Sequence, residues 1–204
     1  MGVNHAPHPE HGDHRRATAE RNVESILDAV ERLLERGSPV TIAAVASDAG
    51  TSRVTVYAHF STREQLLEAT LERSVRRAGA ALEAAAPDVG SPLEALDRLV
   101  AVAWQVLERF AGMAAATMEA VPHDRHQQLH GPAMAPVSRL VERGRREGVF
   151  RHDVPADWLV ACTYALFHAA AAEVRAGRLD VATAHRALSL SVRDLFVGRA
   201  AGRS

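Results

Sequence analysis

The 204-residue sequence contains no lysine, a single cysteine and only nine aromatic residues. The lone Cys162 excludes an internal disulfide and the clustered thiolates of a structural zinc or iron–sulfur site, and it fits a reducing compartment. No apolar run reaches the roughly 20 residues that span a bilayer, and no apolar segment of a secretory signal follows the first methionine. We therefore expect a cytoplasmic protein without membrane contact.

Alanine and arginine, by contrast, are abundant, with 39 and 24 residues respectively. Both are strong helix formers, while residues that favour strands are few apart from valine. Helical periodicity of apolar residues recurs in about nine segments, which predicts an all-α fold. The net charge of −1 predicts no general attraction to nucleic acid, so any binding to a polyanion requires a local arrangement of charges.

The first 17 residues lack a hydrophobic period and are interrupted by Pro7, Pro9 and Gly12, which predicts a flexible tail. Four histidines recur there at every third position: His5, His8, His11 and His14. Metal binding by such a tract is one interpretation, but a flexible segment offers neither a rigid scaffold nor carboxylates that orient the rings. We expect no dedicated metal site and no cofactor.

Residues 18–65 have the pattern of a small three-helix domain, followed by a helical bundle over residues 66–204. A first amphipathic helix is expected from Thr18 to Gly37. Thr41, the pair Thr51-Ser52 and the pair Ser61-Thr62 have the character of N-caps of three further helices. The last of these runs to about residue 83. Later helices are predicted over about 92–110, 113–120, 133–146, 155–175 and 181–197, and the segment 122–132 is consistent with a loop or a weak helix.

The segment 41–60 has the spacing of a helix-turn-helix. Ala46 is small enough for two helices to cross closely, and Gly50, four residues later, tolerates the positive φ that the turn requires. The second helix is short enough to enter the major groove of DNA. From Thr51 to Arg63 the sequence carries two arginines, one histidine and no acidic residue, so a local positive surface is expected.

The run from Gly50 to Leu67 resembles the DNA-binding region of the TetR family of bacterial transcriptional regulators. The most distinctive element is Tyr57-x-His59-Phe60 followed by Ser61-Thr62-Arg63-Glu64. The resemblance covers roughly residues 18–70. It implies a homodimer that binds a palindromic operator in double-stranded DNA, acts most often as a repressor, and leaves the operator when a small-molecule effector binds.

The chemistry of the individual side chains supports this interpretation. Arg53 can bind guanine or phosphate, Val54 can contact a thymine methyl group, and Tyr57 can donate to a phosphate oxygen. Phe60 is expected in the core rather than stacked on a base. The predicted DNA-binding residues are Thr41, Thr51, Ser52, Arg53, Val54, Thr55, Tyr57, His59 and Arg63.

The resemblance also implies an effector pocket and a dimer interface formed by the last two helices. The candidate ligand-binding residues are Trp104, Leu107, Phe110, Met113, Thr117, Met118, Met134, Tyr164, Phe167 and His168. Each of them is also compatible with ordinary core packing. The segment 158–172 is apolar on nearly all sides, with Leu159 and Phe167 expected on opposite faces, and Ala184, Leu188, Ser191 and Leu195 form a stripe suited to close packing.

Two alternatives stay open at this point. His123, His126 and His130, with Asp124 beside them, could share a helix face and hold a metal, although prolines bracket them. The other alternative is a helical dimer that has lost DNA binding or performs catalysis. Against catalysis, the sequence lacks a glycine-rich phosphate loop and a Gly-x-Ser-x-Gly motif. We therefore expect a regulator rather than an enzyme.

Overall fold

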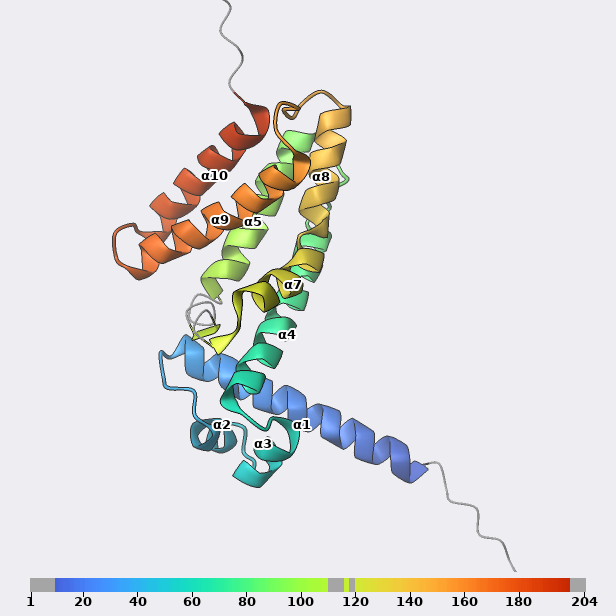
Figure 1. The fold of residues 1–204 in the computed structure, drawn as a ribbon, viewed down its shortest axis with the longest axis vertical. Coiled ribbons are helices and arrows are strands. Elements are labelled where there is room, and N and C mark those ends of the chain that lie inside the picture. Colours follow the sequence, from blue (N-terminus) through green and yellow to red (C-terminus); the bar gives the residue numbers. More distant parts are fainter. Residues whose placement is uncertain (1–9, 110–115, 118–119, 199–204) are drawn as a thin grey trace, which may run out of the picture. The chain divides into compact units, whose positions relative to one another are not determined.

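The computed structural model describes residues 10–109, 116–117 and 120–198, and all regular structure in these ranges is helical (Figure 1). This confirms the predicted all-α class. Contacts divide the chain into two compact units, residues 1–70 and 71–204. The division falls within helix α4 (Arg63–Ala84), a few residues after the boundary expected from the sequence.

The N-terminal unit is built from α1 (Glu10–Glu35), α2 (Ile42–Asp48), α3 (Arg53–His59) and the first residues of α4. Its core contains one fully buried apolar side chain or more from each helix: Ile26, Val30, Val45, Val56, Leu66 and Leu67. The spacing of Ile26 and Val30 places both on one face of α1, as the periodicity predicts. The three-helix arrangement follows from these matched apolar faces.

The first helix begins earlier than expected. Residues 10–17, predicted to be part of a flexible tail, form the N-terminal turns of α1, so this part of the prediction is wrong. Arg16 and Glu20 form an ion pair one helical turn apart, with 3.3 Å between Nε and Oε1. The single glycine in this stretch, Gly12, weakens a helix by only about 1 kcal/mol. His5 and His8 lie outside the described residues.

The C-terminal unit contains α5 (Pro92–Arg109), α7 (His123–Ala133), α8 (Ala135–Arg146), α9 (Ala156–Arg175) and α10 (Val181–Val197), together with α4 from residue 71 onward. Figure 1 shows α9 and α10 side by side, with α5 and α8 beside them. The main core of this unit includes Leu96, Leu140, Phe150, Leu159 and Phe196, all at most 2% exposed.

The segment 122–132, for which a loop and a weak helix were both open, is helical. Pro132 lies near the C-terminal end of α7, and α8 begins at Ala135 with Pro136 in its first turn. Because proline lacks an amide hydrogen and clashes with the preceding turn, it ends one helix and is tolerated in the first turn of the next. The two prolines therefore explain the break between α7 and α8.

The buried face of α9 differs from the one predicted. In α9 the buried residues are Leu159, Thr163, Phe167 and Ala171, so Leu159 and Phe167 share a face and the prediction that they oppose each other is wrong. A spacing of four residues keeps side chains on one side of a helix. In α10, Ala184 and Leu188 of the predicted stripe are buried in the core of the C-terminal unit, whereas Ser191 is exposed.

No helix among the described residues has the length and apolarity to cross a membrane.

Candidate nucleic-acid interface and ligand cavity

The helix-turn-helix has the predicted caps and turn. The Thr41 hydroxyl accepts a hydrogen bond from the Ala44 amide (3.1 Å), and the Ser52 hydroxyl accepts one from the Thr55 amide (3.0 Å). Gly50 has a φ of +65°, which is strained for residues with a β-carbon. These local interactions fix where α2 ends and where α3 begins.

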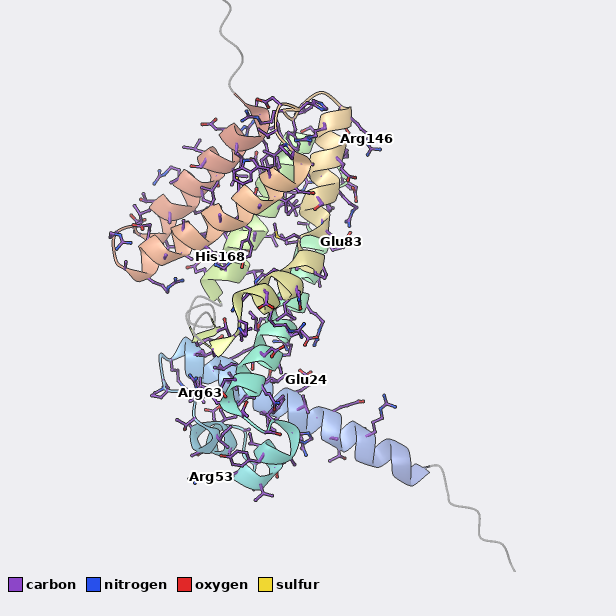
Figure 2. All side chains as sticks on the ribbon, viewed as in Figure 1. Glu24, Arg53, Arg63, Glu83, Arg146 and His168 are labelled. Carbon is purple, nitrogen blue, oxygen red and sulfur yellow. The ribbon has the colours of Figure 1, made fainter. Side chains whose placement is uncertain are left out.

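Helix α3 has one buried side and one exposed side. Val56 is fully buried between the helices of the N-terminal unit, whereas Arg53 is exposed and Val54 and Tyr57 are 79% and 55% exposed. Figure 2 shows Arg53 projecting outward from α3. An exposed valine next to an exposed tyrosine is unusual on a helix whose opposite side is packed, and it marks this surface as a candidate contact surface.

The other predicted DNA-binding residues surround this surface. Thr41 and Ser52 are exposed, and Thr51, Thr55 and His59 are partly exposed. The hydroxyl oxygens of Ser52 and Thr55 lie 2.8 Å apart and share a hydrogen bond. Phe60 is buried at 8% exposure, which confirms its predicted place in the core.

Arg63 begins α4 and is labelled in Figure 2. A cation at a helix N-terminus is unfavourable for the helix dipole unless another group compensates it. Here Arg63 Nε donates a hydrogen bond to the carbonyl oxygen of Val40 (2.8 Å). This contact holds the start of α4 against the segment between α1 and α2, while the Arg63 side chain stays exposed.

Asp48 is the one acidic residue in the segment 41–60. Its carboxylate accepts hydrogen bonds from Arg36 (2.5 Å) and Arg32 (2.7 Å) of α1, and these bonds hold the pKa of Asp48 below its ordinary value. The negative charge next to the turn is therefore compensated within the unit. In the acid-free stretch from Thr51 to Arg63, both arginines are exposed.

A second candidate site is an apolar cavity of about 150 Å³ inside the C-terminal unit. Five of the predicted ligand-binding residues line it: Leu107, Met134, Tyr164, Phe167 and His168. Phe110, Met113 and Met118 lie outside the described residues. Trp104 and Thr117 do not line this cavity.

Trp104 packs elsewhere in the same unit. Its indole is 5% exposed and lies parallel to the ring of His185 on α10, with 6.1 Å between the ring centroids. The side chain therefore joins α5 to α10. Thr117, which is fully buried, uses its carbonyl oxygen to accept a hydrogen bond from His126 Nε2 (3.0 Å).

The cavity has one polar end. The ring of Tyr164 lies 4.2 Å from that of His168 and 5.1 Å from that of His130, measured between centroids. Burial lowers the pKa of His130, and burial together with repulsion from other cationic groups lowers the pKa of His168 to about 4. Both imidazoles are therefore neutral at pH 7. Figure 2 shows His168 on α9.

Sequence reasoning missed His130 as a cavity residue and considered it only as a metal ligand. On α7 its ring stacks on that of His126, with centroids 5.9 Å apart, and each ring bonds to a main-chain carbonyl. In the described ranges, no group of three or more histidine, cysteine, aspartate or glutamate side chains is arranged to hold a metal.

The apolar wall of the cavity was also largely missed. It comes from the inner faces of α4, α5 and α8, and its members include Leu71, Val75, Leu82, Leu99, Val100 and Val137. Their periodicity identifies them as buried. Nothing in the sequence distinguishes a core residue that touches a cavity from one that fills the core completely.

The N-terminal region matches a family model described as bacterial regulatory proteins, tetR family, over residues 26–70. An uncharacterized HTH-type transcriptional regulator of Mycobacterium tuberculosis (strain CDC 1551 / Oshkosh) is 41% identical over 73 residues. That match spans 35% of this chain and 36% of the relative, so about a third of the relative's length is covered. The residues that the family model matches include α2 and α3, on which the candidate nucleic-acid interface is built.

Solved structures resemble the fold over most of the chain. FadR of Bacillus subtilis, solved in complex with stearoyl-CoA, has a TM-score of 0.70 at 15% identity and covers 86% of this chain and 97% of its own. LfrR of Mycobacterium smegmatis, a TetR-like regulator solved in complex with proflavine, has a TM-score of 0.65 at 22% identity. It covers 85% of this chain and 94% of its own. At these identities the likeness concerns the fold alone.

Proposed function

We propose that this chain, which belongs to the TetR family of bacterial regulatory proteins, is a sequence-specific DNA-binding transcriptional regulator. We further propose that the protein is a cytoplasmic homodimeric repressor and that a small molecule releases it from a palindromic operator. The activity is binding rather than catalysis.

The observation that carries the proposal is the two-sided packing of α3. Val56 fixes the helix to the core, while Arg53, Val54 and Tyr57 remain exposed on the other side. A helix held in this way can enter the major groove, where arginine pairs with guanine and an aliphatic group meets the thymine methyl. Tyr57 is well placed to donate its hydroxyl hydrogen to a phosphate oxygen.

The N-cap residues of α2 and α3 supply further contacts to the DNA backbone. Thr41 lies at the N-terminus of α2 and is exposed, so its hydroxyl and the neighbouring amides can bind a phosphate. Thr51, Ser52, Thr55, His59 and Arg63 complete the proposed binding surface. We propose that these residues position the protein on the DNA backbone, and that Arg53 and Val54 read the base sequence.

Dimerisation through α9 and α10 is the second part of the proposal. One helix of seven residues makes few base contacts, and a two-fold axis places a second copy in the next half-site. Exposed side chains on the two helices support this assignment, since Trp158 is 57% and Leu190 61% exposed. On α9, Ala161, Ala165 and Ala169 are exposed as well, and such small residues allow helices to approach closely.

The cavity is the proposed effector site. Its apolar wall and few polar groups are typical of small-molecule pockets. Helix α4 provides Leu66 and Leu67 to the core of the N-terminal unit and Leu71 and Val75 to the cavity wall, so a ligand that displaces it acts on both. A coupling of about 1–3 kcal/mol between effector and operator is typical of such regulators, and it is reciprocal.

The test is selection of binding sites from a random pool of DNA duplexes by the purified full chain, followed by affinity measurements on the enriched sequence. We expect a palindrome, and we expect log K to fall steeply with log salt concentration because several phosphates are contacted. Enrichment of no sequence, or an affinity that does not change with salt, would contradict the proposal. The same duplex with one half-site scrambled is the matched control and should bind more weakly.

A further inference from the structure

The polar end of the cavity contains a histidine whose tautomer is set by its surroundings. His130 Nδ1 lies 2.8 Å from the carbonyl oxygen of His126. A carbonyl oxygen only accepts hydrogen bonds, so the hydrogen of the neutral ring must be on Nδ1. Nε2 of His130 then carries a lone pair and is a hydrogen-bond acceptor.

The neighbouring ring of His126 cannot fill that role. Its Nε2 bonds to the carbonyl oxygen of Thr117 (3.0 Å), and it is 5% exposed and stacked on His130. The main-chain carbonyls of Thr117 and His126 thus fix both rings. The hydroxyl hydrogen of Thr163 is also in use, because it is donated to the Leu159 carbonyl oxygen (2.7 Å).

Three polar groups at this end of the cavity can make further hydrogen bonds. Within the described part of the chain, neither the Tyr164 hydroxyl nor the His168 ring makes a hydrogen bond, and His130 makes only the one through Nδ1. All three side chains are partly buried and line the cavity. Polar groups in apolar surroundings are normally hydrogen-bonded, so this arrangement points to a ligand that supplies the missing partner.

We propose that the cavity binds a small, uncharged, mainly apolar molecule that carries one hydroxyl group, a phenol or an alcohol, and that Nε2 of His130 accepts the hydrogen bond from this hydroxyl. The inference rests on the proposed function of the cavity as an effector site and adds the chemical class of the effector. Tyr164 donates to the hydroxyl oxygen of the ligand, and the apolar wall surrounds the remainder.

Size and charge both favour this class. A cavity of about 150 Å³ lined by aliphatic and aromatic side chains accommodates a molecule of about the size of benzene. A carboxylate would need a cationic partner, but burial keeps the His130 and His168 rings neutral at pH 7. A plain hydrocarbon would leave Nε2 of His130 and the Tyr164 hydroxyl without partners.

The test is calorimetric titration of the full chain, without DNA, with three probes of similar size: p-cresol, toluene and benzoate. We expect p-cresol to bind about threefold to tenfold more tightly than either of the others, which is the usual contribution of one hydrogen bond. Equal or tighter binding of toluene or benzoate would overturn the assigned class. Binding of none of the probes would overturn the assignment as well.

A pair of variants localises the effect. His130→Phe keeps a planar ring but removes the acceptor, and it should abolish the preference for p-cresol over toluene. His152→Gln removes an exposed histidine that bonds to the Arg145 carbonyl and should leave the preference unchanged. A preference that survives in a folded His130→Phe protein would contradict the role of Nε2.

A spectroscopic measurement keeps the proposal testable if His130→Phe does not fold. Nitrogen-15 NMR of the histidine rings in the unmodified protein should show His130 protonated on Nδ1, with an Nε2 signal that moves when p-cresol is added. A hydrogen on Nε2, or a signal unaffected by p-cresol, would overturn the proposal. These experiments contain no DNA, so their failure beside normal operator binding would refute the effector class and leave the proposed regulator function intact.

Discussion

Gly144 of α8 and Phe150 lie in direct contact, because a β-carbon at position 144 would be only 2.1 Å from Cδ2 of the Phe150 ring. The amides of Val149 and Phe150 both donate to the Gly144 carbonyl, at 2.9 and 3.1 Å. The ring then meets Phe196 of α10 edge to face, with centroids 5.1 Å apart. The missing side chain at position 144 therefore allows the turn after α8 to place an aromatic ring in the core.

We predict that Gly144→Ala lowers the free energy of unfolding by about 1–3 kcal/mol, since the Phe150 ring must move out of a packed core. The matched control is Gly131→Ala on α7, where a β-carbon would meet no atom within 4 Å. Alanine favours helix there by up to about 1 kcal/mol. Urea denaturation of both variants measures the difference, and similar stability of the two would contradict the close contact.

Arg53→Ala should weaken binding to the selected operator by about 1–3 kcal/mol, in keeping with the loss of one base or phosphate contact. Two outcomes separate these roles. A base contact predicts relaxed specificity at one position of the operator, and a phosphate contact predicts a salt dependence that is smaller by about one charge. Fluorescence anisotropy on operator variants at several salt concentrations measures both.

The control for Arg53→Ala is Arg146→Ala, which removes an exposed arginine of α8 in the C-terminal unit (Figure 2). Its affinity for the operator should match that of the unchanged protein. If both variants weaken binding equally, the effect is one of net charge, and the role assigned to α3 is refuted.

Ala165→Arg should convert the proposed dimer into a monomer, because a long cation would replace a small exposed residue of α9 at the interface. Arginine is a good helix former, so we expect the helix itself to remain stable. Ala80→Arg, at an exposed position of α4, is the control and should remain dimeric. Light scattering coupled to size-exclusion chromatography gives the mass of each variant. A dimeric Ala165→Arg protein would show that this face of α9 is not the dimer interface.

Acidification should destabilise the protein between about pH 6.5 and pH 4. The pKa of His168 is lowered to about 4 by burial, then by repulsion from His130, Arg175 and His126, with the uncharged Tyr164 also against the ring. In that range the unfolded chain binds a proton that the folded chain does not, so stability falls as pH decreases. One proton corresponds to at most about 1.4 kcal/mol per pH unit.

Denaturation at several pH values tests whether His168 causes this loss of stability. His168→Gln should show a shallower loss of stability between pH 6.5 and 4, whereas His152→Gln, which removes an exposed histidine, should follow the unchanged protein. An identical pH dependence in His168→Gln would show that His168 is not responsible.

The N-terminal unit could be predicted well from the sequence because its determinants are local. The caps at Thr41 and Ser52, the positive φ of Gly50 and the burial of Val56 each depend on residues within a few positions along the chain. Helix α1 starts earlier than predicted, because Gly12 alone does not interrupt it and the ion pair between Arg16 and Glu20 supports it.

The C-terminal unit was less predictable because its determinants are tertiary. In an apolar helix such as α9, hydrophobic character on all sides does not reveal which side is inside, so Leu159 and Phe167 were placed on opposite faces. The polar end of the cavity depends on His130 and His168, which are far apart in the sequence and whose rings lie 6.2 Å apart only because α7 packs near α9. No local pattern encodes that proximity.

Val54 has a consequence for the thermodynamics of recognition. At 79% exposure, its methyl groups add almost nothing to the stability of the fold and remain surrounded by ordered water. Transfer of this side chain onto a thymine methyl would release that water, and burial of apolar surface lowers the heat capacity. Val54 thus contributes hydrophobic free energy to the complex with DNA rather than to the fold. Binding should therefore become more exothermic as the temperature rises.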